Sequence, residues 1–214
     1  MTTTILYIHV LSLVYWLGGD LGTFLSSRYI VRDELGVEAR KTAFSILQEC
    51  DLGPKLAMPL TLGSGFHLTA TYWPNLFVSF AIPMVWLVVL LWLSLVYFQH
   101  HSGGNPRVAT ADLWLRYAVL LLGSFFAFQA WQAGLANWVA LKMAVFLSLV
   151  GLGIAVRYAL KPFALAYVQM VTEGATAKTN DAMRHHLAVC RRYVWVIWVG
   201  LFVNAALGLR LVNV

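Results

Sequence analysis

The chain has 214 residues, of which 60% are hydrophobic and only 11% are charged, and its mean hydropathy is +0.73. Soluble domains carry about 25% charged residues, so this composition excludes an ordinary water-soluble protein. The net charge of +6 does not indicate nucleic-acid binding, because the 15 Lys and Arg residues lie between apolar runs and form no basic tract. We therefore expect an all-α polytopic membrane helical bundle that forms one transmembrane domain over residues 1–214.

Six apolar stretches are long enough to cross a membrane, and each is expected to be a helix, since lipid offers backbone groups no other partner. The predicted spans are residues 4–26, 54–72, 76–98, 113–131, 137–160 and 193–212. The first is expected to stay as a span, because it shows neither a basic leading segment nor a small-residue cleavage site. Pro59 and Pro83 lie inside the second and third spans, where they are expected to kink the helices.

Two further segments, residues 37–50 and 181–192, are polar but carry apolar residues at helical spacing. Ala39, Ala43, Ile46 and Cys50 form such a pattern in the first segment. Amphipathic segments of this kind are typical of helices that lie in the membrane interface. We therefore expect two interfacial helices beside the six spans.

The positive charges are distributed unevenly between the connections of this predicted topology. Thirteen of the fifteen Lys and Arg residues fall on one side of the six spans. The positive-inside bias makes that side cytoplasmic and places both termini on the outer, periplasmic side. The two exceptions, Lys142 and Arg210, lie near the outer face.

Two histidines within the spans stand at matching depth. His9 lies about five residues into the first span and His67 about six residues before the second span ends, so both are about 8 to 10 Å below the outer boundary. A b-type haem needs two axial ligands on facing helices at one depth, and neutral imidazole is a usual ligand of haem iron. The alternative is that each histidine donates a hydrogen bond within the bundle.

Three other ionisable residues extend this candidate site. Lys142 and Arg210 are suited to bind the propionates of a haem near the outer face, or they extend to the interface as solvated cations. Asp20 lies about 16 Å below His9. It is a candidate proton relay or quinone contact, or else it pairs with Arg28 or caps a glycine-rich turn.

Small residues surround both histidines in the sequence. Gly63 and Gly65 precede His67, and Gly18, Gly19 and Gly22 follow His9 on the first span. Such residues allow a flat macrocycle or a neighbouring helix to approach the backbone closely. The pairs His100-His101 and His185-His186, in contrast, are expected to be solvated loop residues.

The first span also resembles a known group of proteins. The run of His9, Trp16, Leu17, Gly18 and Gly19 is similar to the first helix of small bacterial membrane proteins that include the haem-containing protoporphyrinogen oxidase. Similar helices occur in the copper-resistance D-type proteins and in uncharacterised relatives. Trp138 followed by Lys142 resembles that oxidase's Trp-His-x-Lys-Leu region, without its intervening His and with a longer spacing. The resemblance implies haem b binding by His9 and a place in the bacterial inner membrane.

These observations lead to one main functional hypothesis and three alternatives. The main hypothesis is a membrane protein that binds one haem b and transfers electrons to or from the quinone pool or a redox protein, with self-association left open. The alternatives are an enzyme that resembles the protoporphyrinogen oxidase, a non-redox copper transporter using His9, His67, Met58 and Met143, and a structural subunit. The predicted cofactor-binding residues are His9 and His67 as axial ligands of the haem iron, with Lys142, Arg210, Trp16, Gly19, Gly65 and Asp20.

Overall fold

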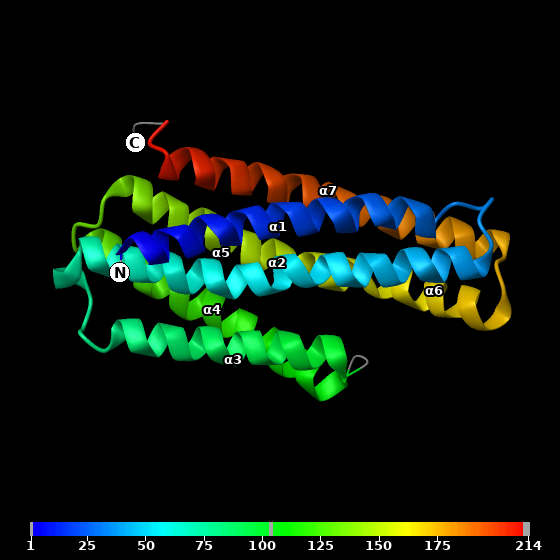
Figure 1. The fold of residues 1–214 in the computed structure, drawn as a ribbon, viewed down its shortest axis with the longest axis horizontal. Helices are drawn as coiled ribbons and strands as arrows, with labels where there is room; N and C mark the ends of the chain where they lie inside the picture. Colours follow the sequence, from blue (N-terminus) through cyan, green and yellow to red (C-terminus); the bar gives the residue numbers. More distant parts are fainter. Residues whose placement is uncertain (1, 103–104, 212–214) are drawn as a thin grey trace.

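The computed structural model describes residues 2–102 and 105–211, which form a helical bundle without β-strands. The helices are α1 (Thr2–Ile30), α2 (Val37–Tyr72), α3 (Ala81–His101), α4 (Pro106–Gln132), α5 (Asn137–Ala159), α6 (Lys161–Glu173) and α7 (Ala177–Gly208), with a short 3-10 helix η1 (Pro74–Leu76). Both ends of the chain lie at the same end of the bundle (Figure 1). The all-α prediction is therefore confirmed.

Five helical segments are long and apolar enough to cross a membrane. They are α1, α3, α4, α7 and the continuous stretch of α5 and α6. Their outward faces carry large apolar side chains, and Leu87, Leu121 and Phe125 are each more than half exposed. In water such a surface would be unstable, whereas in lipid it needs no cover, so the chain is a multi-pass membrane protein. The remaining long helix, α2, carries all its Asp, Glu, Lys and Arg residues in the part that ends at Lys55.

The main core lies where α1, α2, α5 and α7 meet, with α3 and α4 packed on one side. Trp16 of α1 meets Phe146 of α5 edge to face, with ring centroids 6.2 Å apart. Trp198 of α7 packs against Phe24 of α1 at 5.1 Å. These contacts set the rotation of α1 about its axis, and so they decide which of its polar residues face inward.

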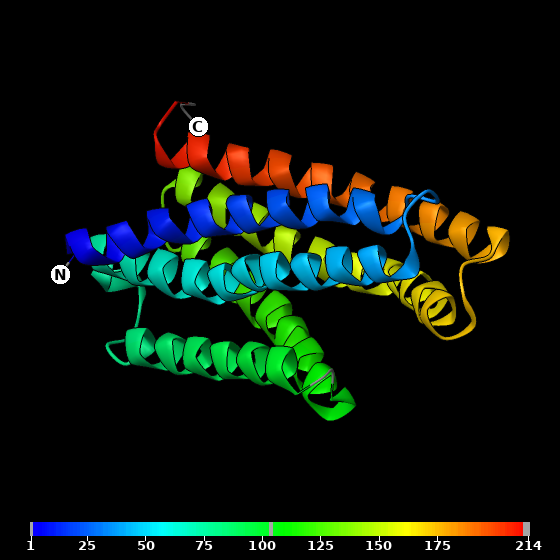
Figure 2. The same cartoon turned by 45° about the vertical axis from the view of Figure 1, so that its right-hand side comes forward.

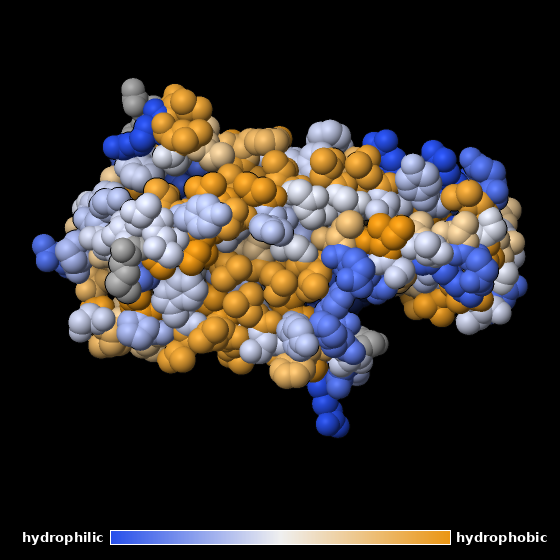
Figure 3. All heavy atoms as spheres, in the orientation of Figure 1, coloured by the Kyte–Doolittle hydropathy of each residue, from blue (hydrophilic) through white to orange (hydrophobic). Residues whose placement is uncertain are grey.

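Several helices extend beyond the membrane thickness at the end opposite the termini. α2 has 36 residues and α7 has 32, which at about 1.5 Å per residue gives about 54 and 48 Å, against about 30 Å of hydrocarbon. The hairpin of α3 and α4 ends earlier (Figures 1 and 2). We call the projecting part, made of the end of α1, the starts of α2 and α7, and α6, the helical extension. More hydrophilic residues appear there than around α3 and α4 (Figure 3).

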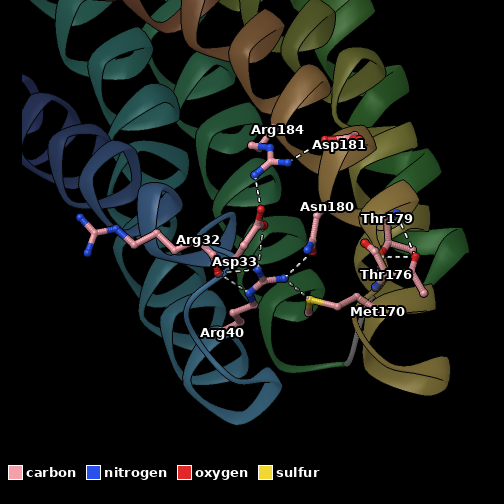
Figure 4. A network of polar contacts seen from close by, with 9 residues as sticks. All are labelled: Arg32, Asp33, Arg40, Met170, Thr176, Thr179, Asn180, Asp181 and Arg184. Carbon is pink, nitrogen blue, oxygen red and sulfur yellow. Dashed lines mark hydrogen bonds and ion pairs between the residues drawn. The ribbon is translucent and has the colours of Figure 1, made fainter.

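The helical extension has a small apolar core of its own and a buried arginine. Its core includes Ile30, Ala43, Met170 and Met183. Arg40 of α2 is fully buried, and its guanidinium donates to the carbonyl of Arg32, to Oδ1 of Asn180 at 2.8 Å and to Sδ of Met170 at 3.1 Å (Figure 4). The contacts join the connection after α1 to α6 and α7.

The two predicted interfacial helices are wrong as separate elements. Residues 37–50 form the first part of α2, and residues 181–192 belong to α7. Ala43, Met183 and Leu187 of these segments pack with α6 in the core of the helical extension, whereas Ile46 is 52% exposed. α6 itself was not predicted, and the end of the sixth predicted span, Val212, lies outside the described residues.

The third predicted span also begins later than expected. Pro74–Leu76 forms η1, and α3 begins only at Ala81. Pro83 therefore lies in the first helical turn, where the missing N–H has no partner to lose and no kink is required. Pro59, in contrast, lies within α2 as predicted, together with Pro54.

Candidate functional site

His9 of α1 faces α2, where a serine orients its ring. Its Nδ1 is 2.9 Å from Oγ of Ser64, whose hydroxyl donates to the carbonyl of Leu60. Because the Ser64 hydroxyl uses its hydrogen in the bond to Leu60, it has none to donate to His9. His9 therefore carries the hydrogen on Nδ1 and donates it to Oγ of Ser64. The proton on Nδ1 leaves a lone pair on Nε2, which is the arrangement of a metal-binding imidazole.

His67 is on the same helix as Ser64 but faces a different neighbour. Trp86 of α3 donates its Nε1–H to Nδ1 of His67 over 3.2 Å. An indole nitrogen can only donate, so Nδ1 of His67 holds the lone pair and Nε2 carries the proton. Its ring is directed at α3, while the ring of His9 lies against Gly65.

The two histidines therefore differ in their fitness for a haem iron. They are at nearly the same level, because His9 contacts Gly65 and His67 follows two residues, or about 3 Å, later. His9 has the free Nε2 lone pair that an axial ligand requires. His67 does not fit in this arrangement, because its Nε2 is protonated and its ring is hydrogen-bonded to Trp86.

A lysine and an asparagine extend the site around His9. The Lys142 ammonium of α5 acts electrostatically on His9, and its Nζ would be 2.8 Å from a methyl group placed on Gly208 of α7. Lys142 forms no ion pair with any described residue. Asn204 lies one turn before Gly208, on the side of α7 that faces α5, and its buried Oδ1 accepts no hydrogen bond from the described residues. A partly buried cation is thus available for an anionic group.

Arg210 lies at the same end of the bundle but makes a different contact. Its guanidinium is 4.5 Å from the ring centroid of Trp138, at the start of α5. Trp138 in turn meets Trp73 edge to face. Arg210 is thus held near the end of α5 by a cation–π contact and is exposed.

The predicted small residues serve helix packing. A methyl group on Gly19 would be 2.3 Å from Cδ of Pro54, and one on Gly65 would be 3.1 Å from Cε1 of His9. Gly18 meets nothing within 4 Å and instead lines an open groove of about 570 Å³ on the surface of α1 and α2. Trp16, 2% exposed, is part of the core and touches Phe146. The glycines were predicted to allow close approach of either a flat macrocycle or a neighbouring helix. Gly19 allows the approach of a neighbouring helix.

Asp20 lies deeper, inside a continuous helix. The expected glycine-rich turn does not exist, because α1 runs unbroken from Thr2 to Ile30. Among the described residues Asp20 makes no ion pair, so its pairing with Arg28 is not seen. Its carboxyl lies beside the indoles of Trp16 and Trp198 and near Asp51 of α2.

A second polar centre was missed by the sequence analysis. Asp112 of α4 is 2% exposed, and its carboxylate accepts from Trp92 at 3.0 Å, Arg116 at 3.0 Å and Arg157 at 2.8 Å. The i, i+4 spacing of Asp112 and Arg116 was a visible signal. The positive charges of Arg116 and Arg157 were counted only toward topology, and their burial depends on how α4 meets α3 and α5.

The predicted histidine pairs lie in helices and not in loops, because His100 and His101 end α3 and His185 and His186 belong to α7. His100 lies 3.5 Å from Glu49, and His101 contacts the carbonyl of Tyr97. Cys50 and Cys190 are free thiols. Within the described part of the chain, no group of three or more His, Cys, Asp or Glu residues is close enough to hold a metal ion.

No family model matches the sequence, and neither a curated protein nor a solved structure matches it.

Proposed function

We propose that this multi-pass membrane protein binds one haem b through His9, near the end that carries both termini, and transfers electrons to or from the quinone pool. The observation that carries the proposal is the Ser64 contact, which leaves the Nε2 lone pair of His9 available to iron. The resemblance of the first span to haem-containing membrane proteins supports the same assignment.

The charges around His9 support a ligand with anionic groups. Lys142 is the cation near His9, and Arg210 lies at the same end of the bundle. Carboxylates such as haem propionates form charge-assisted hydrogen bonds with such groups. A haem would supply one-electron redox chemistry; Ser64 would orient its ligand, and Lys142 would bind a propionate.

The proposal includes a topology of six crossings with both termini outside. α2 would be the sixth span, because it packs along α1 and beside α3, and its part from Leu56 to Tyr72 has no Asp, Glu, Lys or Arg. Thirteen of the fifteen Lys and Arg residues would then face the cytoplasm. We place the protein in the bacterial inner membrane.

A reporter fusion tests this orientation. A reporter that is active only in the periplasm, fused to the C-terminus, should be active, and an inactive but expressed fusion would contradict the orientation.

Absorption spectra of the purified protein test the haem proposal. Wild type should show a b-type spectrum with a pyridine haemochrome, and His9→Ala should lose it. His67→Ala should keep the haem, since His67 is bonded to Trp86. His101→Ala, at an exposed end of α3, is the matched control and should equal wild type.

The spin state separates the two ligand arrangements. One histidine ligand predicts a high-spin spectrum, whereas a low-spin spectrum lost in both His9→Ala and His67→Ala would show that His67 leaves Trp86 to become the second ligand. A colourless wild type, produced with adequate haem supply, would overturn the proposal. Complementation of a strain that lacks the haem-containing protoporphyrinogen oxidase would favour the enzymatic alternative that resembles it.

A further inference from the structure

Asp20 belongs to the inward face of α1. It lies one turn after Trp16 and one turn before Phe24, which are 2% and 7% exposed. Residues four apart share a helix face, so the Asp20 carboxyl is directed into the same core as these two rings. Apolar side chains of α5, Phe146, Leu149 and Val150, belong to that core.

The indole of Trp198 is an unusual neighbour for this carboxyl. Trp198 is only 9% exposed, and its Nε1 makes no hydrogen bond with any described residue although the indole lies beside Asp20. A buried N–H without an acceptor is unfavourable, because it has given up its hydrogen bond to water. The indole N–H of Trp198 is therefore a donor available to the Asp20 carboxylate.

The charged groups around Asp20 do not neutralise it. From α2 it faces Asp51, which is paired with Lys55. On α1 and α7, Arg28 and Arg191 lie over the ring of Phe24, and Arg191 donates to the Phe24 carbonyl. An ionised carboxylate in this position would be desolvated, beside a second carboxylate and without a bound cation.

Asp51 connects this position to the charged end of the bundle. The contact between His100, at the end of α3, and Glu49 of α2 marks the level at which α3 ends beside α2. Asp51 follows two residues later, and its side chain is 32% exposed. It is thus within reach of water at the end opposite the termini.

We propose that Asp20 is a proton-binding site of the membrane domain, which exchanges its proton with water at the charged end through Asp51. The step is the reversible addition of one proton to the Asp20 carboxylate, with Trp198 donating to the ionised form. It goes beyond the proposed haem function and does not require bound haem.

Labelling with dicyclohexylcarbodiimide tests this proposal, because the apolar reagent modifies protonated carboxyl groups in membranes. Wild-type protein in liposomes is labelled between about pH 5 and pH 8 and mapped by mass spectrometry. We expect labelling of Asp20 that rises as the pH falls. Asp112 is the internal control: it is more deeply buried than Asp20, and its carboxylate is paired with Arg116 and Arg157, so it should stay unlabelled.

Two variants test the neighbours. Asp51→Asn removes a negative charge and should move the labelling midpoint down by about 0.5 to 1 pH unit, whereas Trp198→Phe removes a donor to the carboxylate and should move it up.

The infrared C=O stretch of a protonated carboxyl, lost in Asp20→Asn, is a reagent-free second measurement. Absence of both the label and the stretch would overturn the proposal, and an unchanged midpoint in Asp51→Asn would contradict the placement of the Asp51 carboxylate beside Asp20, on which the exchange route depends. Labelling is read without haem, so a colourless protein leaves this test intact.

Discussion

At the scale of single residues, hydrogen-bond partners decide what each polar side chain can do. His9 and His67 are the same residue type at the same level, yet Ser64 frees the Nε2 lone pair of one while Trp86 fixes the opposite tautomer in the other. The sequence predicted their depth, because depth follows from the rise per residue. It could not predict their partners, which depend on the rotation of each helix.

Asp112 is the residue whose loss we expect to be most damaging to stability. Asp112→Asn should lower the free energy of unfolding by about 3 to 5 kcal/mol, because it leaves the guanidiniums of Arg116 and Arg157 without a carboxylate. Thermal unfolding in detergent measures this. Glu38→Gln, which breaks only the exposed pair with Lys41, should change the midpoint little. Equal midpoints for the two variants would contradict a stabilising role of the Asp112 network.

At the scale of elements, α1 and α2 pack at backbone distance. Pro54 has no N–H for the carbonyl of Cys50, four residues earlier, and this carbonyl would lie 2.8 Å from a methyl group on Gly19. A methyl group on Gly53 would in turn lie 3.2 Å from the carbonyl oxygen of Tyr15. Proline and glycine thus act together, one exposing a carbonyl and the other letting a helix approach it.

Adjacent glycines of α1 provide a matched test of this packing. Gly19→Ala should destabilise the protein by about 1 to 3 kcal/mol, because its methyl group would overlap Pro54. Gly18→Ala should be neutral or slightly stabilising, since nothing lies within 4 Å and alanine favours the helix. Thermal unfolding of both variants gives the comparison. A larger loss in Gly18→Ala would refute the packing described for α1 and α2.

At the scale of the whole molecule, the helical extension turns two amphipathic segments into parts of long helices. Arg40 closes this end by joining the connection after α1 to α6 and α7, and Asp33 in that connection also pairs with Arg184 of α7 (Figure 4). Arg184 pairs with Asp181 as well, at 2.6 Å. The extension is therefore held by polar contacts as well as by its small apolar core.

Limited proteolysis tests the role of Arg40. Arg40→Met should increase trypsin cleavage at Arg32, in the connection after α1, and at Lys178, at the start of α7, by at least about tenfold, because it leaves buried acceptors unpaired and loosens the extension. Lys41→Met, at the adjacent position, removes only an exposed pair and should resemble wild type. Unchanged cleavage in Arg40→Met would show that the apolar core alone holds this end.

The sequence by itself determined the helical class, the membrane setting and the approximate position of most spans, because apolar length and composition are local properties of the chain. Only the tertiary structure decided which side chains meet. Each residue turns a helix by about 100°, so Gly65 and His67 differ by about 200° and face different neighbours despite their similar depth. For the same reason the burial of Asp112 and Arg40 could not be predicted from the sequence. A charged residue near a helix end is expected to be solvated, and only the packing of neighbouring helices shows that it is buried.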